Sequence, residues 1–215
     1  AMYCNDKSKL LPRPISICGI NPTEGTLRVV YRVAGEGTKE FSEMKAGDTL
    51  EVMGPLGNGF TMKNEKAIII GGGIGIPPML ELAKQLDAEK TVVLGYRTST
   101  FLKEEFEEVC DVKIATEDGS QGAKGTVIDA IEKYGVEGKV IYACGPMPML
   151  KALAAYAEEH GMEAQISLEE RMACGIGACL GCICKSKTKD HHTNVNNTRI
   201  CKDGPVFDAK EVVFS

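Results

Sequence analysis

The chain has 215 residues, a formal net charge of −5 at pH 7 and 43% hydrophobic residues. This length allows two compact domains, or three if one is small, and the acidic balance argues against nucleic acid as the main partner. The sequence has no apolar run long enough to span a membrane and no visible signal peptide, so we expect a cytoplasmic location. The nine cysteines are then expected to be metal ligands and buried thiols rather than disulfides.

Residues 1–63 are predicted to form a β-rich first domain. Apolar and polar residues alternate there with the period of two that half-buried strands show. Strands are expected near 15–17, 27–33 and 49–53, and a short helix is expected at 38–44.

Residues 64–168 are predicted to form a doubly wound parallel α/β domain, because strand and helix patterns alternate along them. The run Ala67 to Ile70 is continuously apolar, as expected of a parallel strand that is buried on both faces. Further strands are expected at 91–96, 112–116, 139–143 and 164–168, with helices after Pro77-Pro78, around 127–131 and at 147–160.

Residues 169–215 are predicted to form a small third domain around a group of cysteines. Cys174, Cys179 and Cys182 have the C-x4-C-x2-C spacing of plant-type [2Fe–2S] clusters, and Cys201 is the candidate fourth ligand. Glycines between them allow the backbone to turn tightly and to direct amide N–H groups at sulfur. Such a cluster carries single electrons, so the spacing predicts an electron-transfer protein.

Zinc is the alternative metal for this segment. Cys184, His191 and His192 lie nearby in the sequence and could complete a zinc ligand set, which would make the chain a non-enzymatic zinc-binding interaction module. The spacing of three cysteines within nine residues favours the cluster, since zinc sites usually consist of two separated pairs. We therefore expect Cys184 to be a packing residue and the two histidines to be surface residues.

Two glycine- and proline-rich turns in the second domain indicate a nucleotide. Gly71-Gly72-Gly73-Ile74-Gly75 follows a predicted buried strand and precedes a helix, and Cys144-Gly145-Pro146 follows another strand. Ligands of open α/β sheets bind beyond the carboxyl ends of the strands. The first turn is not a strict G-x-G-x-x-G, so a simple tight turn is the alternative.

The first domain carries two candidate anion-binding segments. Arg13-Pro14-Ile15-Ser16 combines a guanidinium with a hydroxyl, and Gly35 to Thr38 opens the predicted short helix. A solvated surface charge and a hairpin turn are the respective alternatives.

Taken together, these segments resemble the ferredoxin–NADP⁺ reductase superfamily, and more closely the electron-transfer subunits of NAD-dependent (type B) dihydroorotate dehydrogenases. The resemblance extends over essentially all 215 residues. It depends on the segments RPIS, YRVAGEGT, GGGIGIPPM with CGPMPM, and RMACGIGACLGC followed by RICKDGPVF.

The resemblance implies a flavin-binding β-barrel, an NAD-binding domain and a [2Fe–2S] domain. It implies FAD contacts from Arg13, Pro14, Ile15, Ser16, Val30, Tyr31, Arg32, Gly37 and Thr38. It implies that NAD(H), as substrate, binds at Gly72, Gly73, Gly75, Cys144, Gly145 and Pro146. The cluster ligands would be Cys174, Cys179, Cys182 and Cys201.

The implied function is electron transfer between NAD(H), FAD and the cluster, to or from the FMN of a catalytic dihydroorotate dehydrogenase subunit in an α2β2 assembly of pyrimidine biosynthesis. The chain would hold no orotate site and no general base. The flavin and iron–sulfur subunit of a hydrogenase-linked or ferredoxin-linked NAD(P)H reductase is the alternative within the superfamily.

The sequence departs from the family pattern at its beginning. Only twelve residues precede Arg13, whereas the family barrel has two further strands before that motif, so we expect the chain to begin inside the domain and the barrel to be incomplete. Arg97 follows the second predicted strand of the nucleotide domain and could contact a 2′-phosphate, although the resemblance implies NADH.

Overall fold

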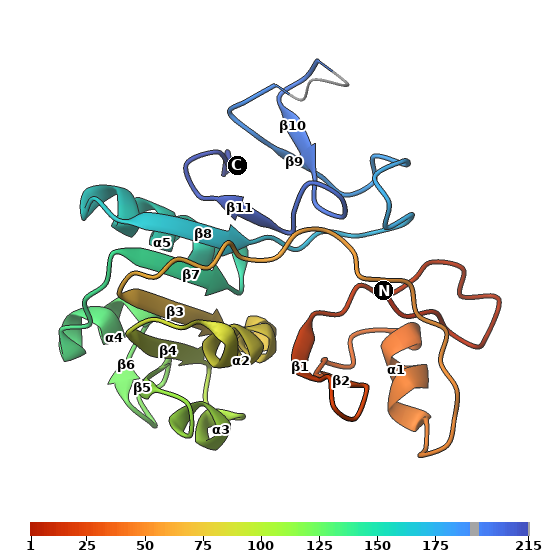
Figure 1. Cartoon of the computed structure of the whole chain (residues 1–215), viewed down its shortest axis with the longest axis horizontal. Helices are drawn as coiled ribbons and strands as arrows, with labels where there is room; N and C mark the ends of the chain where they lie inside the picture. The colour runs from red at the N-terminus through yellow and green to blue at the C-terminus, as the bar shows by residue number, and fades with distance from the viewer. Residues whose placement is uncertain (190–193, 215) are drawn as a thin grey trace.

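The computed structural model describes residues 1–189 and 194–214. His191 and His192 lie outside the described residues, so the prediction made for them stays untested. The described chain has an N-terminal part with α1, a central sheet flanked by helices, and a C-terminal part above the junction of the other two (Figure 1).

The centre of the molecule is a seven-stranded sheet with the order β11-β8-β7-β3-β4-β5-β6. Its strands are β3 (Ala67–Gly72), β4 (Lys90–Tyr96), β5 (Asp111–Thr116), β6 (Ala123–Lys124), β7 (Val140–Cys144), β8 (Glu163–Ser167) and β11 (Val206–Asp208). Neighbouring strands are parallel except β11, which is antiparallel to β8. The predicted doubly wound parallel sheet is confirmed.

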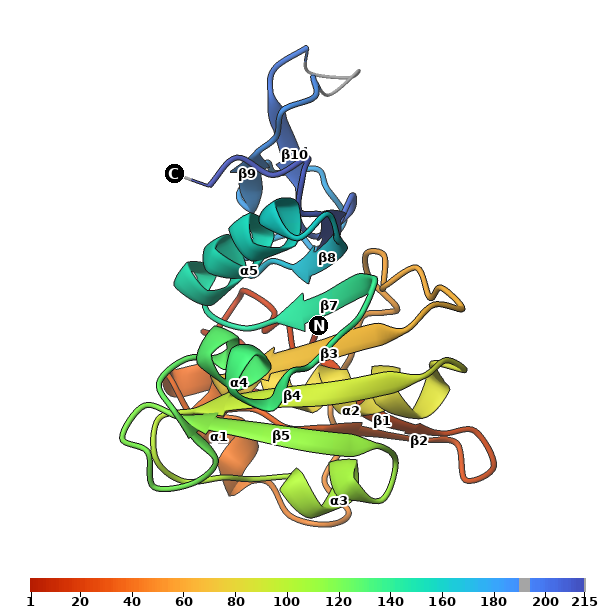
Figure 2. The ribbon, with the colours of Figure 1, turned by 90° about the vertical axis from the view of Figure 1, so that its left-hand side faces the viewer.

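Helices cover both faces of this sheet (Figure 2). They are α2 (Ile76–Gln85), α3 (Lys103–Glu107), α4 (Val127–Tyr134) and α5 (Met147–Glu159). On β3, Ile68 and Ile70 pack into the core formed with α4 and α5, while Ile69 packs into the core formed with α2 and α3. This alternation explains the apolar run, since every residue from Ala67 to Ile70 enters one core or the other. The prediction missed α3 and β6, which are both short.

The chain reverses its direction of sheet growth between β3 and β7. From β3 it proceeds outward through β4, β5 and β6, and then returns to place β7 on the other side of β3. Gly71 pairs with Cys144 in this register, so the two Gly-rich turns leave the sheet side by side. Open α/β sheets bind their ligands at such a switch point.

The N-terminal part contains one hairpin and one helix. The hairpin joins β1 (Ile17–Asn21) to β2 (Thr26–Val29), and α1 spans Glu36–Glu43. Three predicted strand boundaries were wrong. The first strand begins only at Ile17, since Pro12 and Pro14 lack the N–H that a ladder needs.

The other two predicted strands, at 27–33 and 49–53, are longer than the structure allows because backbone pairing covers only part of each. The strand predicted at 27–33 ends at Val29, where pairing with β1 stops. The segment 49–53 contributes a single bridge, between Val52 and Met2, and Met2 also bridges to Arg13. A sequence pattern shows which face of a strand is buried, but it does not show whether a neighbouring strand is present to pair with it.

The C-terminal part is built onto the central sheet. β9 (Ile183–Lys185) and β10 (Asn197–Arg199) form a separate antiparallel pair, whereas β11 extends the central sheet beside β8. Cys182, Ile200 and Cys201 are buried in the same core as α4 and α5. The domain boundary at 168/169 stays a prediction, and the two units that it separates share a core. Within the described ranges, no helix is long and apolar enough to cross a membrane.

Candidate functional site

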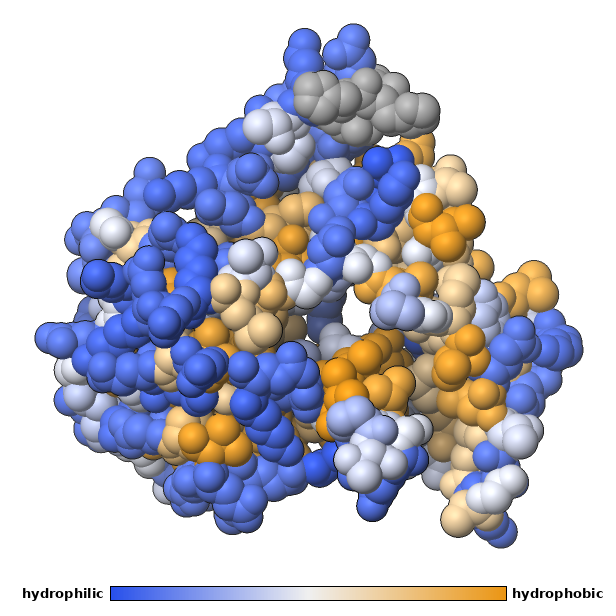
Figure 3. Space-filling view, viewed as in Figure 1, coloured by the Kyte–Doolittle hydropathy of each residue, from blue (hydrophilic) through white to orange (hydrophobic). Residues whose placement is uncertain are grey.

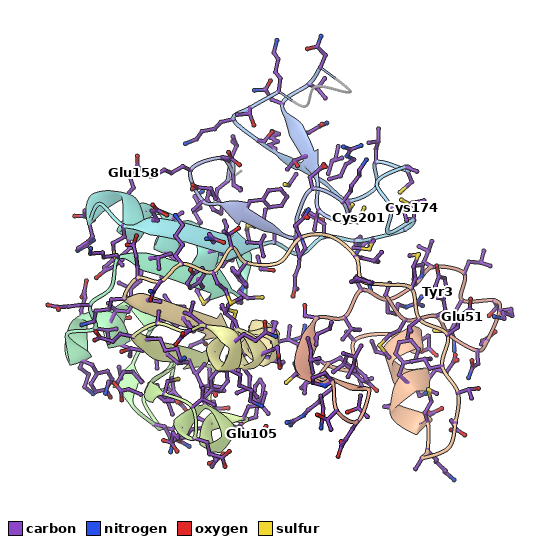
Figure 4. All side chains as sticks on the ribbon, in the orientation of Figure 1. Tyr3, Glu51, Glu105, Glu158, Cys174 and Cys201 are labelled. Carbon is purple, nitrogen blue, oxygen red and sulfur yellow. The ribbon has the colours of Figure 1, made fainter. Side chains whose placement is uncertain are left out.

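The four predicted cluster cysteines come together in the C-terminal part. The Gly177 N–H donates to Cys201 Sγ at 3.1 Å, and the Cys201 N–H donates to Cys182 Sγ at 3.4 Å. The loop that carries the first three cysteines therefore closes over Cys201, which the pairing of β9 with β10 brings back to it. Figure 4 shows Cys174 and Cys201 on neighbouring segments of this part.

Each of the four sulfurs accepts at least one backbone N–H. Cys174 Sγ accepts from Ala178 at 3.3 Å and from Cys179 at 3.4 Å, and Cys179 Sγ accepts from Gly181 at 3.4 Å. These amides lower the pKa of Cys174 to about 6, with the Cys179 N–H as the largest contribution. Burial, followed by the neighbouring Cys182, raises the pKa of Cys201.

The cysteine geometry fits a binuclear cluster. The Cys179 side chain acts on the pKa of Cys174 and the Cys182 side chain acts on that of Cys201, so the four thiols fall into two pairs. A [2Fe–2S] cluster needs two thiolates on each iron, and the amide donors supply the hydrogen bonds that tune such clusters. Among the described residues, no three His, Cys, Asp or Glu side chains are grouped tightly enough for a single metal ion.

Cys184 stands apart from this set. It lies on β9, half-buried against the sheet core, and burial raises its pKa to about 11. Its side chain packs against the core, as predicted.

The cluster loop rests on the end of the N-terminal part. Gly175 has φ +73°, and a Cβ there would lie 2.6 Å from Met53 Cε and 3.2 Å from Leu56 Cδ1. The Asn58 Nδ2 donates to the carbonyls of Lys202 at 2.9 Å and Asp203 at 3.2 Å. The cysteines are thereby fixed against the predicted flavin-binding part.

The open end of the β1–β2 hairpin carries both predicted flavin segments. Ile17 pairs with Val29, so residues 13–16 and 30–32 leave the hairpin at the same end. Pro14, Ser16 and Arg32 are exposed, while Arg13, Ile15, Val30, Tyr31 and Thr38 are half-buried.

Arg13 and Gly37 form the tightest contact among these residues. A Cβ at Gly37 would lie 2.3 Å from Arg13 Nε, so the guanidinium occupies the space that a side chain at 37 would need. Gly37 lies in the first turn of α1, where backbone N–H groups are unpaired. A cation over a helix N-terminus suits a phosphate, so this pair fits the pyrophosphate of FAD.

Thr38 and Arg32 have other neighbours. The Thr38 hydroxyl accepts from the Ala34 N–H at 2.9 Å and the Gly35 N–H at 3.1 Å, and it thereby closes the turn that opens α1. The charge of Arg32 acts on Glu169, just before the cluster loop. The side chain of Glu169 is exposed by surface area, but neighbouring protein atoms keep part of the water from its carboxyl and so raise its pKa. The positive charge of Arg32 opposes this rise.

The two nucleotide turns interlock at the switch point. A Cβ at Gly75 would lie 2.4 Å from the Cys144 carbonyl carbon and oxygen, and one at Gly145 would lie 3.1 Å from Gly72 Cα. The glycines are therefore required for the two turns to touch. Gly73 and Pro146 are exposed next to this contact, so the glycine turn that precedes α2 is accessible to a pyrophosphate.

Cys144 contributes its backbone rather than its thiol to this surface. Its side chain is only 1% exposed, and burial raises the pKa of the thiol to about 12. Figure 3 shows an opening at the centre of one face, where the three parts of the chain meet. A cavity of about 360 Å³ lies between α5 and the C-terminal segment, and none of the predicted site residues lines it.

Sequence reasoning missed the contacts that hold the hairpin against the helices. Arg28 forms two hydrogen bonds with Glu105, and the Ile20 N–H donates to Glu81 Oε2 at 3.0 Å. Arg28 and Glu105 are 77 positions apart, and neither belongs to a motif. The sequence contains no signal that would have identified this contact.

Two family models match the chain. Residues 169–213 match the iron–sulfur cluster binding domain of dihydroorotate dehydrogenase B, and residues 69–155 match the oxidoreductase NAD-binding domain. The first covers all four cluster cysteines, and the second covers both nucleotide turns.

Curated relatives match over nearly the whole chain. The "dihydroorotate dehydrogenase B (NAD(+)), electron transfer subunit" of Caldanaerobacter subterraneus subsp. tengcongensis is 46% identical over 98% of this chain and 84% of the relative. The protein of that name from Fusobacterium nucleatum subsp. nucleatum is 44% identical over 96% of this chain and 82% of the relative. A solved structure of the NADH-dependent reduced ferredoxin–NADP oxidoreductase superposes with a TM-score of 0.87 at 31% identity, over 99% of this chain and 77% of that one.

Proposed function

This chain belongs to the family of electron transfer subunits of dihydroorotate dehydrogenase B, and from that membership we propose how its own residues serve the function. It is the electron-transfer component of an NAD-dependent oxidoreductase and exchanges electrons between NAD(H), FAD and a [2Fe–2S] cluster. Its partner is the FMN-containing catalytic subunit, which converts dihydroorotate to orotate in pyrimidine biosynthesis.

The convergence of four cysteine sulfurs carries this proposal. The Gly177 N–H bonds to Cys201 Sγ, which supports Cys201 as the fourth ligand of the C-x4-C-x2-C loop. The two thiol pairs support Cys174 and Cys179 as the ligands that would hold one iron, and Cys182 and Cys201 as those that would hold the other. Amide donors to all four sulfurs stabilise the negative charge that the thiolates bring.

The remaining site residues bind and orient the two nucleotides. Arg13 and the first turn of α1 hold the FAD pyrophosphate, and residues 30–32 lie along the flavin. The turns at 72–75 and 144–146 hold NAD(H) at the switch point. When bound, a flavin accepts a hydride and releases its electrons singly, which matches the one-electron capacity of a cluster. The protein supplies placement, and it contributes no general acid or base.

The nucleotide pocket supports NADH over NADPH. Arg97, the residue that would meet a 2′-phosphate, is largely exposed, and Glu117 lies 4.0 Å from its Nε. A carboxylate this close to the guanidinium disfavours a 2′-phosphate there, by the small amount that an exposed pair allows.

The cluster loop offers a surface for the catalytic subunit. Ile176 is 61% exposed and Leu180 44% exposed, on either side of the exposed Cys179. Leu180 also has φ +58°, which is an unusual conformation for a bulky residue. Apolar side chains around an exposed cluster ligand support docking at this loop, because electrons tunnel efficiently only over short distances.

A cytoplasmic location is also part of the proposal. None of the nine cysteines forms a disulfide in the described part of the chain, which supports a reducing compartment.

Reconstitution with the catalytic subunit tests the proposed function. The complex should reduce NAD⁺ with dihydroorotate, and neither subunit should do so alone. The likeness to the ferredoxin–NADP oxidoreductase makes ferredoxin the second candidate partner. If the protein reduces ferredoxin with NADH and shows no dihydroorotate-dependent activity, ferredoxin is its partner.

A further inference from the structure

The β1–β2 hairpin is attached to the nucleotide-binding helices by three contacts outside the predicted sites. The first is apolar. Cys18 lies in a bulge of β1, where the register shifts, and its side chain is fully buried in the core formed by α2 and the sheet. The bulge redirects this side chain from the hairpin into the neighbouring part.

The second contact joins β1 to α2. Glu81 Oε2 accepts the Ile20 N–H at 3.0 Å, and Glu81 Oε1 accepts from Gln85 Nε2 at 2.5 Å, which fixes the carboxylate on its helix. Because Gly75 is the N-cap of α2, this bond connects the helix of the NAD turn with the strand that follows the flavin segment 13–16.

The third contact joins β2 to α3. Arg28 Nη1 lies 2.5 Å from Glu105 Oε2 and Nη2 lies 3.0 Å from Glu105 Oε1, so the pair is bidentate. Arg28 lies one residue before Val29, where the strand leads into the flavin segment 30–32. Figure 4 shows Glu105 on the side of the helical part that faces the hairpin.

We propose that Arg28, Glu105 and Glu81 form a positioning clamp that holds the flavin-binding hairpin against the NAD-binding helices and so sets the distance between flavin and nicotinamide. The inference rests on the proposed function. Both flavin segments leave the open end of the hairpin, and the clamp grips its two strands separately. A shift of the hairpin would therefore move both flavin segments away from the nicotinamide together.

The clamp acts on position more than on overall stability. The Arg28 and Glu105 side chains are 50% and 34% exposed, and ion pairs with that exposure contribute little to the free energy of unfolding. The Arg28 hydrogen bonds hold the pKa of Glu105 below its ordinary value, so both groups are charged at neutral pH. Hydride transfer is sensitive to displacements of about 1 Å, so a small movement is enough to slow it.

Charge reversal tests the clamp in the holoprotein. Arg28→Glu and Glu105→Arg should each slow flavin reduction at saturating NADH by roughly tenfold or more, with FAD and iron contents unchanged. The double variant R28E/E105R should recover most of the rate, and Arg28→Lys, which keeps the charge but loses the bidentate geometry, should fall between. Stopped-flow absorbance measures these rates, and reduction of the cluster by dithionite serves as the control.

Amide hydrogen exchange supplies a readout that is independent of activity. Exchange in residues 17–29 should rise in each single variant and return in the double variant. The clamp would be overturned if both single variants kept the flavin reduction rate and the amide exchange of the wild type. It would also be overturned if the double variant folded but did not recover the reduction rate. If wild-type flavin is not reduced by NADH, the proposed function fails, and exchange alone then decides whether the clamp exists.

Discussion

The sulfur of each of the four predicted cluster ligands accepts a backbone N–H. The role of a cysteine in this chain therefore depends on the backbone around its sulfur. Cys182 and Cys184 are two positions apart, yet Cys182 contacts Cys201 whereas Cys184 packs against the sheet core. Cys182 precedes β9, which begins at Ile183, so the loop rather than the strand sets the direction of its side chain. Cys184 therefore serves as a matched control for the four ligands.

Cys201→Ala should remove the cluster, because alanine has no atom that could replace the thiolate on iron. Iron should fall from about two atoms per chain to near zero, and the signal of the reduced cluster in electron paramagnetic resonance should disappear. Cys184→Ala should keep both. Iron and sulfide analysis of anaerobic protein measures the effect, and retention of the cluster in Cys201→Ala would refute the ligand assignment.

Gly37→Ala should weaken FAD binding by displacing the Arg13 guanidinium. The new Cβ would meet the flexible end of Arg13 rather than backbone, so we expect the fold to persist. Loss of a charge-assisted hydrogen bond of about 1.5–3 kcal/mol should raise the dissociation constant of FAD roughly 10- to 100-fold. Quenching of flavin fluorescence measures this constant.

Gly35→Ala is the matched control for that variant. Gly35 has extended backbone, and a Cβ there would meet no atom within 4 Å. Equal loss of FAD affinity in both variants would contradict a specific Arg13 contact.

At the residue scale, spacing predicted the cysteines but not the contacts between distant residues. The C-x4-C-x2-C run fixes three sulfurs locally, and Cys201 could be proposed only as a candidate because its approach depends on the pairing of β9 with β10. The contact of Arg13 with Gly37 and the pair of Arg28 with Glu105 have no local pattern at all. Each depends on how two parts of the chain pack.

Among the elements, the interlocked turns after β3 and β7 make the most specific demand on sequence. Gly75→Ala would place a Cβ against the Cys144 backbone, which has no flexible end to move aside. Overpacking of this kind costs about 1–3 kcal/mol, and it should also raise the KM for NADH by separating the turns.

Urea unfolding and steady-state kinetics measure the two effects of Gly75→Ala. Gly59→Ala is the control. Gly59 is exposed, its φ lies outside the left-handed region, and a Cβ there would meet no atom within 4 Å. Unchanged stability and KM in Gly75→Ala would show that the turns do not need this close approach.

Element prediction succeeded where burial alone decides the structure. A continuous apolar run identified β3, and the alternation of strand and helix patterns identified β4 and β7; both faces of all three strands enter a core. It failed in the N-terminal part, where strand 49–53 is reduced to one bridge, and at α3, whose five residues are too few for a periodic pattern. Backbone pairing depends on which segments meet, and periodicity does not contain that information.

For the molecule as a whole, the cluster loop should be the contact with the catalytic subunit. Ile176→Ser combined with Leu180→Ser should raise the dissociation constant of the complex roughly tenfold or more, since buried apolar anchors contribute at least about 1 kcal/mol each. Isothermal titration of holoprotein with the catalytic subunit measures this constant.

Leu27→Ser serves as the control for the docking variant. Leu27 is 62% exposed on β2, away from the cluster loop, and its loss should leave binding unchanged. Equal affinity of the loop variant and the wild type would place the partner on another surface.

The central claim is that this chain joins a flavin and a [2Fe–2S] cluster within one electron-transfer unit. The most direct test is the visible and electron paramagnetic resonance spectrum of anaerobically purified protein before and after NADH. We predict flavin and cluster bands that bleach together, with the signal of a reduced [2Fe–2S] centre. Colourless protein that contains zinc, or flavin that bleaches while an intact cluster stays oxidised, would contradict it.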